Sequence, residues 1–460
     1  MKKLYLILTM LMLTAMVKGQ ELQVKLKQAM EKMQADSSLK HASLSFLVID
    51  AMDGKTVFSS GEDIGLAPAS TQKIFTSIAA YEILGKQFRY KTELSYEGLI
   101  TNGILKGNLV ITANGDPTFG SWRWEQTKDS NILKSFREAL HLKKIMGLEG
   151  NLVIKTPFFA GGSIPGGWIW DDIGNYYGAG SGGFNWRENQ YDLILQSGTT
   201  VGSPVILLSS RPSYVIKRKF DNQVKAGAKG SGDNAYIYFP TGPGSSFMLQ
   251  GTIPAGENNF TISGSSPDPS LDFIQEWKSS MGSAFKQATL KNAPGGITAL
   301  TTFESPPFDS MNYWFMKKSI NLYGESFLKA IALQKKGRAS TTEGVSVLQE
   351  FWKTAGVKEE ALQVLDGSGL SPQNRVTTRA LVTALLFARD RSWFSSFYHS
   401  LPVINNLRMK SGSIGGARSY AGYHTRPDGT SYIFAIIVNN YTGSASRVVR
   451  KMWDVLDELK

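Results

Sequence analysis

The sequence predicts an α+β fold in which helices flank a sheet and a strand-rich insertion interrupts the domain. Both ends of the chain combine helical and strand patterns, so together they have the makings of one α+β domain. Between them, Gly, Asn, Thr and short apolar runs dominate, which is typical of strands joined by turns. We therefore expect one discontinuous domain formed by residues 20–88 and 266–460, and an insertion at 89–265 that consists of two subdomains.

The first segment predicts a helix, two strands and a second helix. In residues 21–35, apolar side chains recur every three or four positions, which is helical spacing. Residues 42–50 (ASLSFLVID) have the pattern of a β-strand, and the Asp53-Gly54 turn allows residues 56–59 to return as a second strand. Residues 70–84 (STQKIFTSIAAYEIL) have the apolar character of a buried helix.

The last segment predicts helices, three strands and a closing helix. The helical patterns fall at 268–286, 308–318, 322–334, 342–355 and 378–390. The strands read LRMKSGSI, RSYAGYH and SYIFAIIVN, with turns at Gly415-Gly416 and at Pro427-Asp428-Gly429. Residues 443–460 are amphipathic, and we expect them to pack on the sheet.

The N-terminus has the pattern of a signal peptide over residues 1–19. A basic start (Lys2, Lys3) precedes an apolar stretch, and small residues then allow cleavage near Gln20. No later stretch approaches the ~20 apolar residues of a membrane span. We therefore expect export to the periplasm without a membrane span.

The amino-acid composition excludes several classes of partner and cofactor. Cysteine is absent, so disulfides, thiolate metal sites and lipoprotein acylation are excluded. The net charge is +12, but Lys and Arg are scattered without a basic run, which argues against nucleic acid. The four histidines have no metal-ligand spacing, so we expect no metal or cofactor. The oligomeric state is not specified by the sequence.

Ser70 and Lys73 form an S-x-x-K pattern at the start of the predicted helix. Ser70 has two interpretations, because serine is also a favoured helix cap and Pro68 suits a helix start. On a helix, positions i and i+3 share one face, so Lys73 could activate the serine hydroxyl as a base. The pattern alone is weak, since Ser326 with Lys329 repeats it.

Two later elements strengthen the catalytic interpretation. Ser319-Ile320-Asn321 falls between two predicted helices, and Lys410-Ser411-Gly412 falls on a predicted strand. The order S-x-x-K, S-x-N, K-[ST]-G is that of active-site serine enzymes that react with penicillin.

With these motifs the chain resembles the D-alanyl-D-alanine carboxypeptidase/endopeptidase family of penicillin-binding protein 4 type, the low-molecular-mass class C enzymes. GDPTFG, GWIWDD, MKKSINLYGE and LDGSGLSPQN resemble further signatures of that family. The 249 residues from Ser70 to Ser319 also match its large insertion. The resemblance implies a penicillin-binding, serine β-lactamase-like fold, with an antiparallel sheet flanked by helices.

The resemblance also implies a role for each matched residue. Ser70 would be acylated, Lys73 would be its general base, and Ser319 would relay protons to the leaving amine. Asn321 would bind the substrate peptide, and Lys410 would attract its terminal carboxylate.

The remaining residues of the third element would bind substrate. Ser411 would assist with its hydroxyl beside Gly412, and the backbone N–H groups of Ser70 and Ser413 would form the oxyanion hole. The implied substrates are the stem peptides of peptidoglycan, and β-lactams would be covalent inhibitors.

One departure from the family concerns side-chain specificity. Asp172 and Tyr177 match positions that bind the substrate's diamino acid, but Pro372 stands where the family often has arginine. Arg375 could substitute for it. The nearby Trp170 is expected to pack in the insertion's core rather than to stack on sugar.

Two other functions remain as alternatives. A non-catalytic cell-wall-binding relative would keep the residues but release no D-alanine. A β-lactamase would turn penicillin over, but the long insertion and the lack of a recognisable deacylating Glu argue against it.

Overall fold

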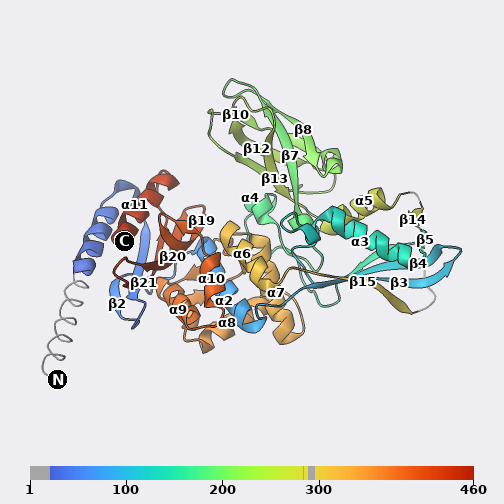
Figure 1. The fold of residues 1–460 in the computed structure, drawn as a ribbon. Coiled ribbons are helices and arrows are strands. Elements are labelled where there is room, and N and C mark those ends of the chain that lie inside the picture. The colour runs from blue at the N-terminus through green and yellow to red at the C-terminus, as the bar shows by residue number, and fades with distance from the viewer. Residues whose placement is uncertain (1–20, 283, 288–295) are drawn as a thin grey trace. The chain divides into compact units, whose positions relative to one another are not determined.

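The computed structural model describes residues 21–282, 284–287 and 296–460, so the expected signal peptide at 1–19 lies outside the described residues (Figure 1). The described chain forms two compact units. The first comprises residues up to 83, 312–319 and 345–460, and the second comprises residues 84–311 and 320–344.

The first unit is built on a six-stranded antiparallel sheet with the order β18-β19-β20-β21-β1-β2. Its strands are β1 Ser43–Asp50, β2 Thr56–Ser60, β18 Val403–Ile404, β19 Leu407–Ile414, β20 Ala417–Thr425 and β21 Ser431–Asn439. Sequence-distant strands meet at the centre, because β1 pairs with β21 along its full length. The N-terminal and C-terminal segments therefore form one sheet, as the sequence predicts.

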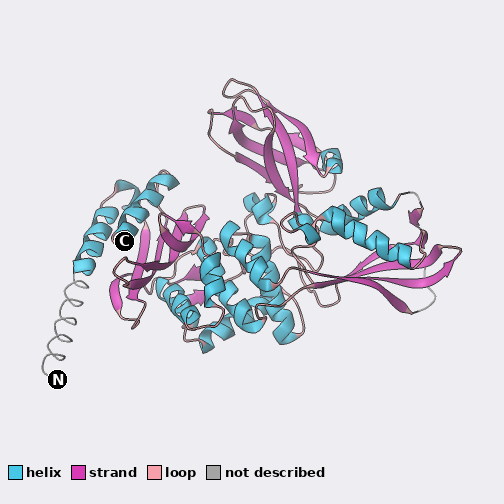
Figure 2. Cartoon of the chain, in the orientation of Figure 1, coloured by secondary structure: helices cyan, strands magenta, loops and turns pink. Residues whose placement is uncertain are grey.

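Helices cover both faces of this sheet (Figures 1 and 2). The helix over residues 21–34 and α11 (Ala445–Asp457) bury their apolar sides against one face in a single hydrophobic core. On the other face lie α2 (Lys73–Ile83) and α9 (Thr378–Arg389), and the Thr378 hydroxyl bonds that of Ser45 on β1 at 2.7 Å.

Further helices complete the first unit. They are η2 Ala69–Gln72, α10 Phe394–Ser400, the part of α8 (Thr341–Thr354) from residue 345 and the part of α6 (Phe308–Lys318) after residue 311. Trp352 of α8 packs edge-on against Phe75 of α2, with ring centroids 5.3 Å apart. This buried aromatic contact anchors the start of α2, which carries Lys73.

The second unit contains two hydrophobic cores. In the first, α3 (Asp129–Leu142) and α5 (Pro269–Met281) pack with a mixed sheet. The strands of that sheet are β3 Lys91–Thr101, β4 Ile104–Ala113, β5 Gly147–Gly150, β6 Leu152–Lys155, β14 Phe285–Gln287 and β15 Ile297–Glu304.

The second core lies between two smaller sheets, ordered β13-β7-β8 and β10-β12-β11, with β9 added to β12. Their strands are β7 Gln190–Ser197, β8 Val205–Arg211, β9 Phe220–Asn222, β10 Lys225–Gly227, β11 Asn234–Tyr238, β12 Phe247–Pro254 and β13 Phe260–Ser265. These strands form the lobe at the top of Figure 1.

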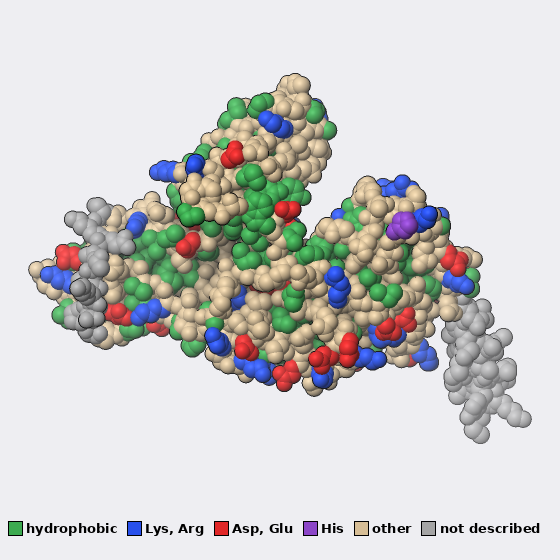
Figure 3. Space-filling model, turned by 180° about the vertical axis from the view of Figure 1, so that it is seen from behind, with side chains coloured by type: hydrophobic (Ala, Val, Ile, Leu, Met, Phe, Trp, Pro, Cys, Tyr) green, Lys and Arg blue, Asp and Glu red, His purple; other side chains and the backbone are tan. Residues whose placement is uncertain are grey.

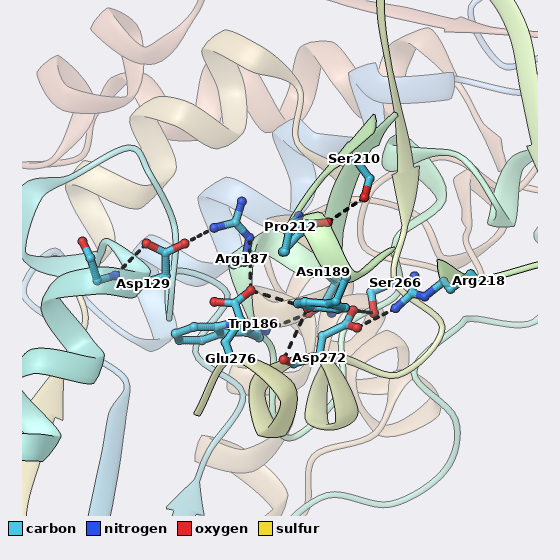
Figure 4. A network of polar contacts seen from close by, with 12 residues as sticks. Asp129, Trp186, Arg187, Asn189, Ser210, Pro212, Arg218, Ser266, Asp272 and Glu276 are labelled. Atoms are coloured by element: carbon cyan, nitrogen blue, oxygen red, sulfur yellow. Dashed lines mark hydrogen bonds and ion pairs between the residues drawn. The ribbon is translucent and has the colours of Figure 1, made fainter. Parts of the chain in front are cut away.

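A polar network connects these two parts of the second unit (Figure 4). Arg187 forms ion pairs with Asp129 at the start of α3 and with Glu276 of α5. Arg218, which follows β8, donates to Asp272 of α5 at 2.5 Å. These side chains are largely buried, so losing one partner would leave a desolvated charge.

Several elements differ from the sequence expectations. The helix α3 lies inside the region expected to be strand-rich, and β15 pairs with β3, so the second unit continues past residue 265 to residue 311. The helix α7 (Asn321–Lys336) also belongs to the second unit. Within the described part of the chain, no helix has the length and apolar character needed to cross a bilayer.

Candidate active site

Ser70 and Lys73 meet at the junction of η2 and α2. The Lys73 Nζ lies 2.8 Å from the Ser70 Oγ and donates to the Ser368 carbonyl at 2.7 Å. Lys73 is fully buried, and its amine faces the Phe315 ring of α6, with 5.9 Å between Nζ and the ring centroid. Ser70 does not cap the helix, since Pro68 occupies the N-cap position of η2. The geometry is that of a hydroxyl beside a potential base.

Strained backbone precedes the serine. Ala69 has φ +48°, a left-handed conformation that is uncommon for a residue with a side chain. Gly369 crosses close to it, because a Cβ at position 369 would lie 2.0 Å from the Ala69 carbonyl oxygen. Strain of this kind persists only where surrounding contacts enforce it, and it is frequent at functional sites.

The enforcing contacts come from the turn around Asp366. Its buried carboxylate accepts hydrogen bonds from the Gln72 amide at 2.9 Å, from Gly369 N at 2.8 Å and from Ser371 N at 2.7 Å. The Gln72 bond ties the turn to η2. The same turn presents the Ser368 carbonyl to Lys73, so Asp366 holds the surroundings of both Ser70 and Lys73.

Ser319 and Lys410 form a second pair in the first unit. The Lys410 Nζ donates to the Ser319 Oγ at 2.9 Å and to the Ser411 carbonyl at 2.8 Å. Ser319 directly follows α6 and has φ +57°, so it is another left-handed residue at the site. Phe315 of α6 faces Lys73, so α6 contacts the first pair and leads directly into a member of the second.

Burial lowers the pKa of the Lys410 amine to about 7, because desolvation disfavours the charged form. A lysine with such a pKa can exchange a proton near neutral pH. It can also be driven to its cationic form when a carboxylate binds beside it.

The strand β19 lies against η2, and glycine makes this approach possible. A Cβ at Gly412 would lie 2.4 Å from the Pro68 carbonyl oxygen and 3.0 Å from the Ser70 nitrogen. Distances below 3.0 Å essentially never occur for a real Cβ. The glycine of the K-S-G element is therefore required where the backbone passes Ser70.

The outward edge of β19 presents backbone donors. Met409 N donates to the Pro402 carbonyl, away from the β20 ladder. Since N–H directions alternate along a strand, the N–H groups of Ser411 and Ser413 point to the same outer edge. This edge also passes η2, so the direction of the Ser413 N–H is compatible with the proposed oxyanion role.

Asn321, Asp172 and Tyr177 lie in the second unit. The Asn321 amide donates to the Tyr177 carbonyl at 2.7 Å. The Asp172 side chain bonds the Tyr177 hydroxyl, and desolvation raises the pKa of the Asp172 carboxyl. In the first unit, Arg375 donates to the carbonyls of Pro372 and Asn374, each at 2.7 Å, which orients its guanidinium toward its own turn.

Sequence reasoning did not identify Asp366 and Phe315 as supports of the site. The LDGSGLSPQN segment resembles a signature of the family, and no sequence pattern indicates that its Asp366 accepts a hydrogen bond from Gln72. Phe315 has no sequence signal beyond its place on an apolar helix face.

Comparisons with known proteins identify the family of the chain. Residues 26–459 match the D-Ala-D-Ala carboxypeptidase 3 (S13) family. The D-alanyl-D-alanine carboxypeptidase of Actinomadura sp. (strain R39) is 24% identical, over 93% of this chain and 83% of that protein. The D-alanyl-D-alanine carboxypeptidase DacB of Haemophilus influenzae is 25% identical, over 81% of this chain and 80% of that protein.

The fold is shared with a solved structure. Penicillin binding protein 4 (dacB) from Haemophilus influenzae superposes with a TM-score of 0.76 at 21% identity, over 96% of this chain and 99% of that one. The same protein complexed with a β-lactam gives a TM-score of 0.71 at 20% identity, over 91% and 96% of the two chains. The α+β architecture expected from the sequence is thereby confirmed. Because the family match spans nearly the whole described chain, this protein belongs to the D-Ala-D-Ala carboxypeptidase 3 (S13) family.

Proposed function

We propose that this serine-type D-Ala-D-Ala carboxypeptidase works through an acyl-enzyme on Ser70, with Lys73 as the general base. The observation that carries the assignment is the 2.8 Å contact between the Lys73 Nζ and the Ser70 Oγ inside a buried site. A serine hydroxyl is a weak nucleophile until a base takes its proton.

The acylation step follows from this arrangement. Lys73 takes the hydroxyl proton as the Ser70 Oγ attacks the carbonyl carbon of the penultimate D-alanine. The C–N bond then breaks, the terminal D-alanine leaves as an amine, and Ser319 with Lys410 delivers its proton. Water next hydrolyses the ester, which releases the shortened peptide and restores the Ser70 hydroxyl.

Backbone N–H groups stabilise the tetrahedral intermediates in this proposal. Ser70 N and Ser413 N would donate to the developing oxyanion, and removing one such donor typically costs about 10²–10³ in rate. In its cationic form, Lys410 attracts the substrate's terminal carboxylate. Ser411 and Asn321 would bind the peptide, with Asp172 and Tyr177 contacting its side chain.

The finer parts of the function rest on the residues and the resemblance. We propose that residues 1–19 direct export to the periplasm and that the enzyme also cleaves peptide cross-links as an endopeptidase. β-Lactams would acylate Ser70, in keeping with the β-lactam complex of the Haemophilus influenzae protein.

The test is mass spectrometry with peptide mapping of penicillin-treated protein, together with D-alanine release from a stem pentapeptide. We expect a persistent penicilloyl adduct on Ser70 that is absent in Ser70→Ala. Ser326→Ala is the matched control, because Ser326 is the serine of another S-x-x-K pattern and its Oγ lies 2.8 Å from the Ser181 Oγ.

Each alternative gives a different result. Fast penicillin turnover in place of a persistent adduct would identify a β-lactamase. Peptide binding without D-alanine release would identify a non-catalytic relative. An adduct that persists in folded Ser70→Ala would refute the assignment of the nucleophile.

A further inference from the structure

Exposed aromatic side chains gather on the second unit, next to α4 (Trp170–Ile173). Trp170 and Tyr236 are 41% and 43% exposed, although a core position was expected for Trp170. The Trp170 and Tyr238 ring centroids are 4.7 Å apart at an interplanar angle of 40°. The ring centroids of Tyr238 and Tyr236 are 6.5 Å apart, at an interplanar angle of 33°. We call Trp170, Tyr236 and Tyr238 the aromatic platform.

Strand geometry explains why two of these rings face solvent. Tyr236 and Tyr238 are two residues apart on β11, so both side chains lie on the same face of the sheet. Ile237, between them, is buried in the core on the opposite face. Figure 3 shows hydrophobic side chains gathered at the base of the lobe that contains β11.

Polar side chains lie beside the rings. Gln250 of β12 stands directly opposite Tyr236, so the two side chains share one face. The Gln250 amide donates to the Gln223 Oε1 at 3.1 Å, and the Gln223 amide donates to Asp221 at 2.7 Å. The face therefore combines flat rings with a connected row of hydrogen-bonding amides and a carboxylate.

The charges on this face favour a neutral polymer. The Asp171 carboxylate lies close enough to Tyr238 to raise the pKa of its hydroxyl, after the larger effect of burial. Asp221 stands opposite Met248 of β12, and Lys225 stands opposite Thr252. A carboxylate and an amine therefore lie one step to either side of Gln250, and their charges offset each other. An anionic polymer such as nucleic acid would meet the two carboxylates beside the rings, whereas sugar hydroxyls can donate to them.

We propose that the aromatic platform binds the glycan strand of peptidoglycan, a β-linked polymer of N-acetylated hexosamines. The C–H face of a pyranose ring packs against the electron-rich face of an aromatic ring. The amides of Gln250 and Gln223 pair with hydroxyl and acetamido groups. This inference rests on the proposed function, since the glycan carries the stem peptides that the enzyme cleaves.

The platform is continuous with residues assigned to the substrate. Burial, then the nearby Asp172 carboxylate and the Tyr236 phenol, raise the pKa of the Tyr177 hydroxyl, which also bonds the Asp172 carboxylate. Tyr236 therefore lies close to Tyr177. A glycan on the platform would therefore hold an attached peptide next to Asp172 and Tyr177. Such tethering raises the effective concentration of the peptide without a new contact to it.

The experiment measures how tightly the full chain binds tetra-N-acetylchitotetraose, a neutral β-linked oligomer of an N-acetylated hexosamine. We expect the double variant Trp170→Ala/Tyr236→Ala to lose at least fivefold in affinity for this oligomer. Trp122→Ala is the matched control, because Trp122 is 47% exposed and lies outside the platform. The variants Trp170→Phe and Tyr236→Phe keep a ring and should keep most of the affinity.

D-Alanine release from a glycan-free pentapeptide is measured on the same preparations. Glycan binding by a wild-type chain that releases no D-alanine would refute the proposed function and leave the platform standing. The platform is overturned if the wild type shows no saturable binding, if the double variant binds like the wild type, or if an oligonucleotide binds the platform more tightly than the glycan. If the double variant loses peptide turnover as well, peptide turnover and glycan affinity are compared in the Trp170→Phe and Tyr236→Phe variants. Restored turnover without restored glycan affinity would overturn the platform.

Discussion

The Lys410 amine donates a hydrogen bond to the Ser319 hydroxyl at 2.9 Å, across 91 residues of sequence. Lys410 lies on a buried strand, and Ser319 occupies a left-handed turn at the end of α6. This bond brings two of the three motifs together, so the properties of Lys410 should be visible in both catalysis and stability.

The activity should depend on the protonation of Lys410. Its pKa of about 7 means that the cation is lost as the pH rises through neutrality. We expect kcat/KM for a peptide with a free terminal carboxylate to fall above about pH 7, because kcat/KM reports the pKa values of the free enzyme. In Lys410→Arg the charge persists, so this alkaline limb should disappear. A limb that stays unchanged in Lys410→Arg would assign it to another group.

The stability of the fold should depend on the same amine. Its pKa is lowered from 10.5 to about 7 on folding, so the unfolded chain binds more protons between these values. The cost of burying the charge is fully present below pH 7 and is relieved as the pH rises toward 10.5. Lys410→Met should remove this contribution, which amounts to several kcal/mol at about 1.4 kcal/mol per pKa unit.

Denaturant unfolding at pH 7 and pH 10 measures this difference. From pH 7 to pH 10, the free energy of unfolding of the wild type should increase relative to that of Lys410→Met. Equal slopes in the two proteins would show that folding does not lower the pKa of Lys410, because the folded and unfolded chains would then bind the same number of protons.

Gly412→Ala should disturb the approach of β19 to Ser70. The added methyl would lie 2.4 Å from the Pro68 carbonyl oxygen, so strand and loop must separate. We expect about 1–3 kcal/mol of destabilisation, as for other overpacked sites. The acylation rate should also fall about 10²-fold, since the oxyanion donors move.

Gly415→Ala is the control for this change. It follows the same strand, and a Cβ there meets no atom within 4 Å. Penicillin acylation and thermal unfolding check both variants. If Gly412→Ala acylates at the wild-type rate, the close approach is not needed for the reaction.

Asp366→Asn should act on Lys73 through the turn that carries Ser368. An amide at 366 must place its NH₂ group against donors that now bond the carboxylate, such as Gly369 N or Ser371 N. An unsatisfied buried group costs about 1–3 kcal/mol. We expect a slower acylation rate and a displaced pH–rate profile, because the Ser368 carbonyl that accepts from Lys73 would shift.

The exposed turn residue Asp53 provides the comparison. Asp53→Asn should leave both the rate and the pH–rate profile unchanged. If Asp366→Asn lowers stability but leaves the pH–rate profile in place, the role of Asp366 is structural only.

The sequence predicted much of the first unit, because the helices and strands of that unit have a strong hydrophobic periodicity. The strands around Phe46 and Ile436, the buried helix after Ser70 and the closing helix with Val448 all appear close to their expected bounds. The contact between Ser70 and Lys73 was also expected, since it depends only on local helical spacing.

Long-range pairing was less accessible to sequence reasoning. The helix containing Phe136 was missed among strand-like runs, and the pairing of Phe303 with Thr92 depends on segments about 200 residues apart that have no shared local signal. The exposure of Trp170 was missed for the same reason, because burial is decided by which distant elements cover a residue.

The pairing of β1 with β21 has a consequence for biosynthesis. Ser43 pairs with Asn439, so the central sheet joins segments that are synthesised far apart in time. A nascent chain cannot complete this sheet while its C-terminal strands are still in the ribosome. The structure around the nucleophile therefore forms only after β21 has been synthesised, and slow assembly is expected from such distant contacts.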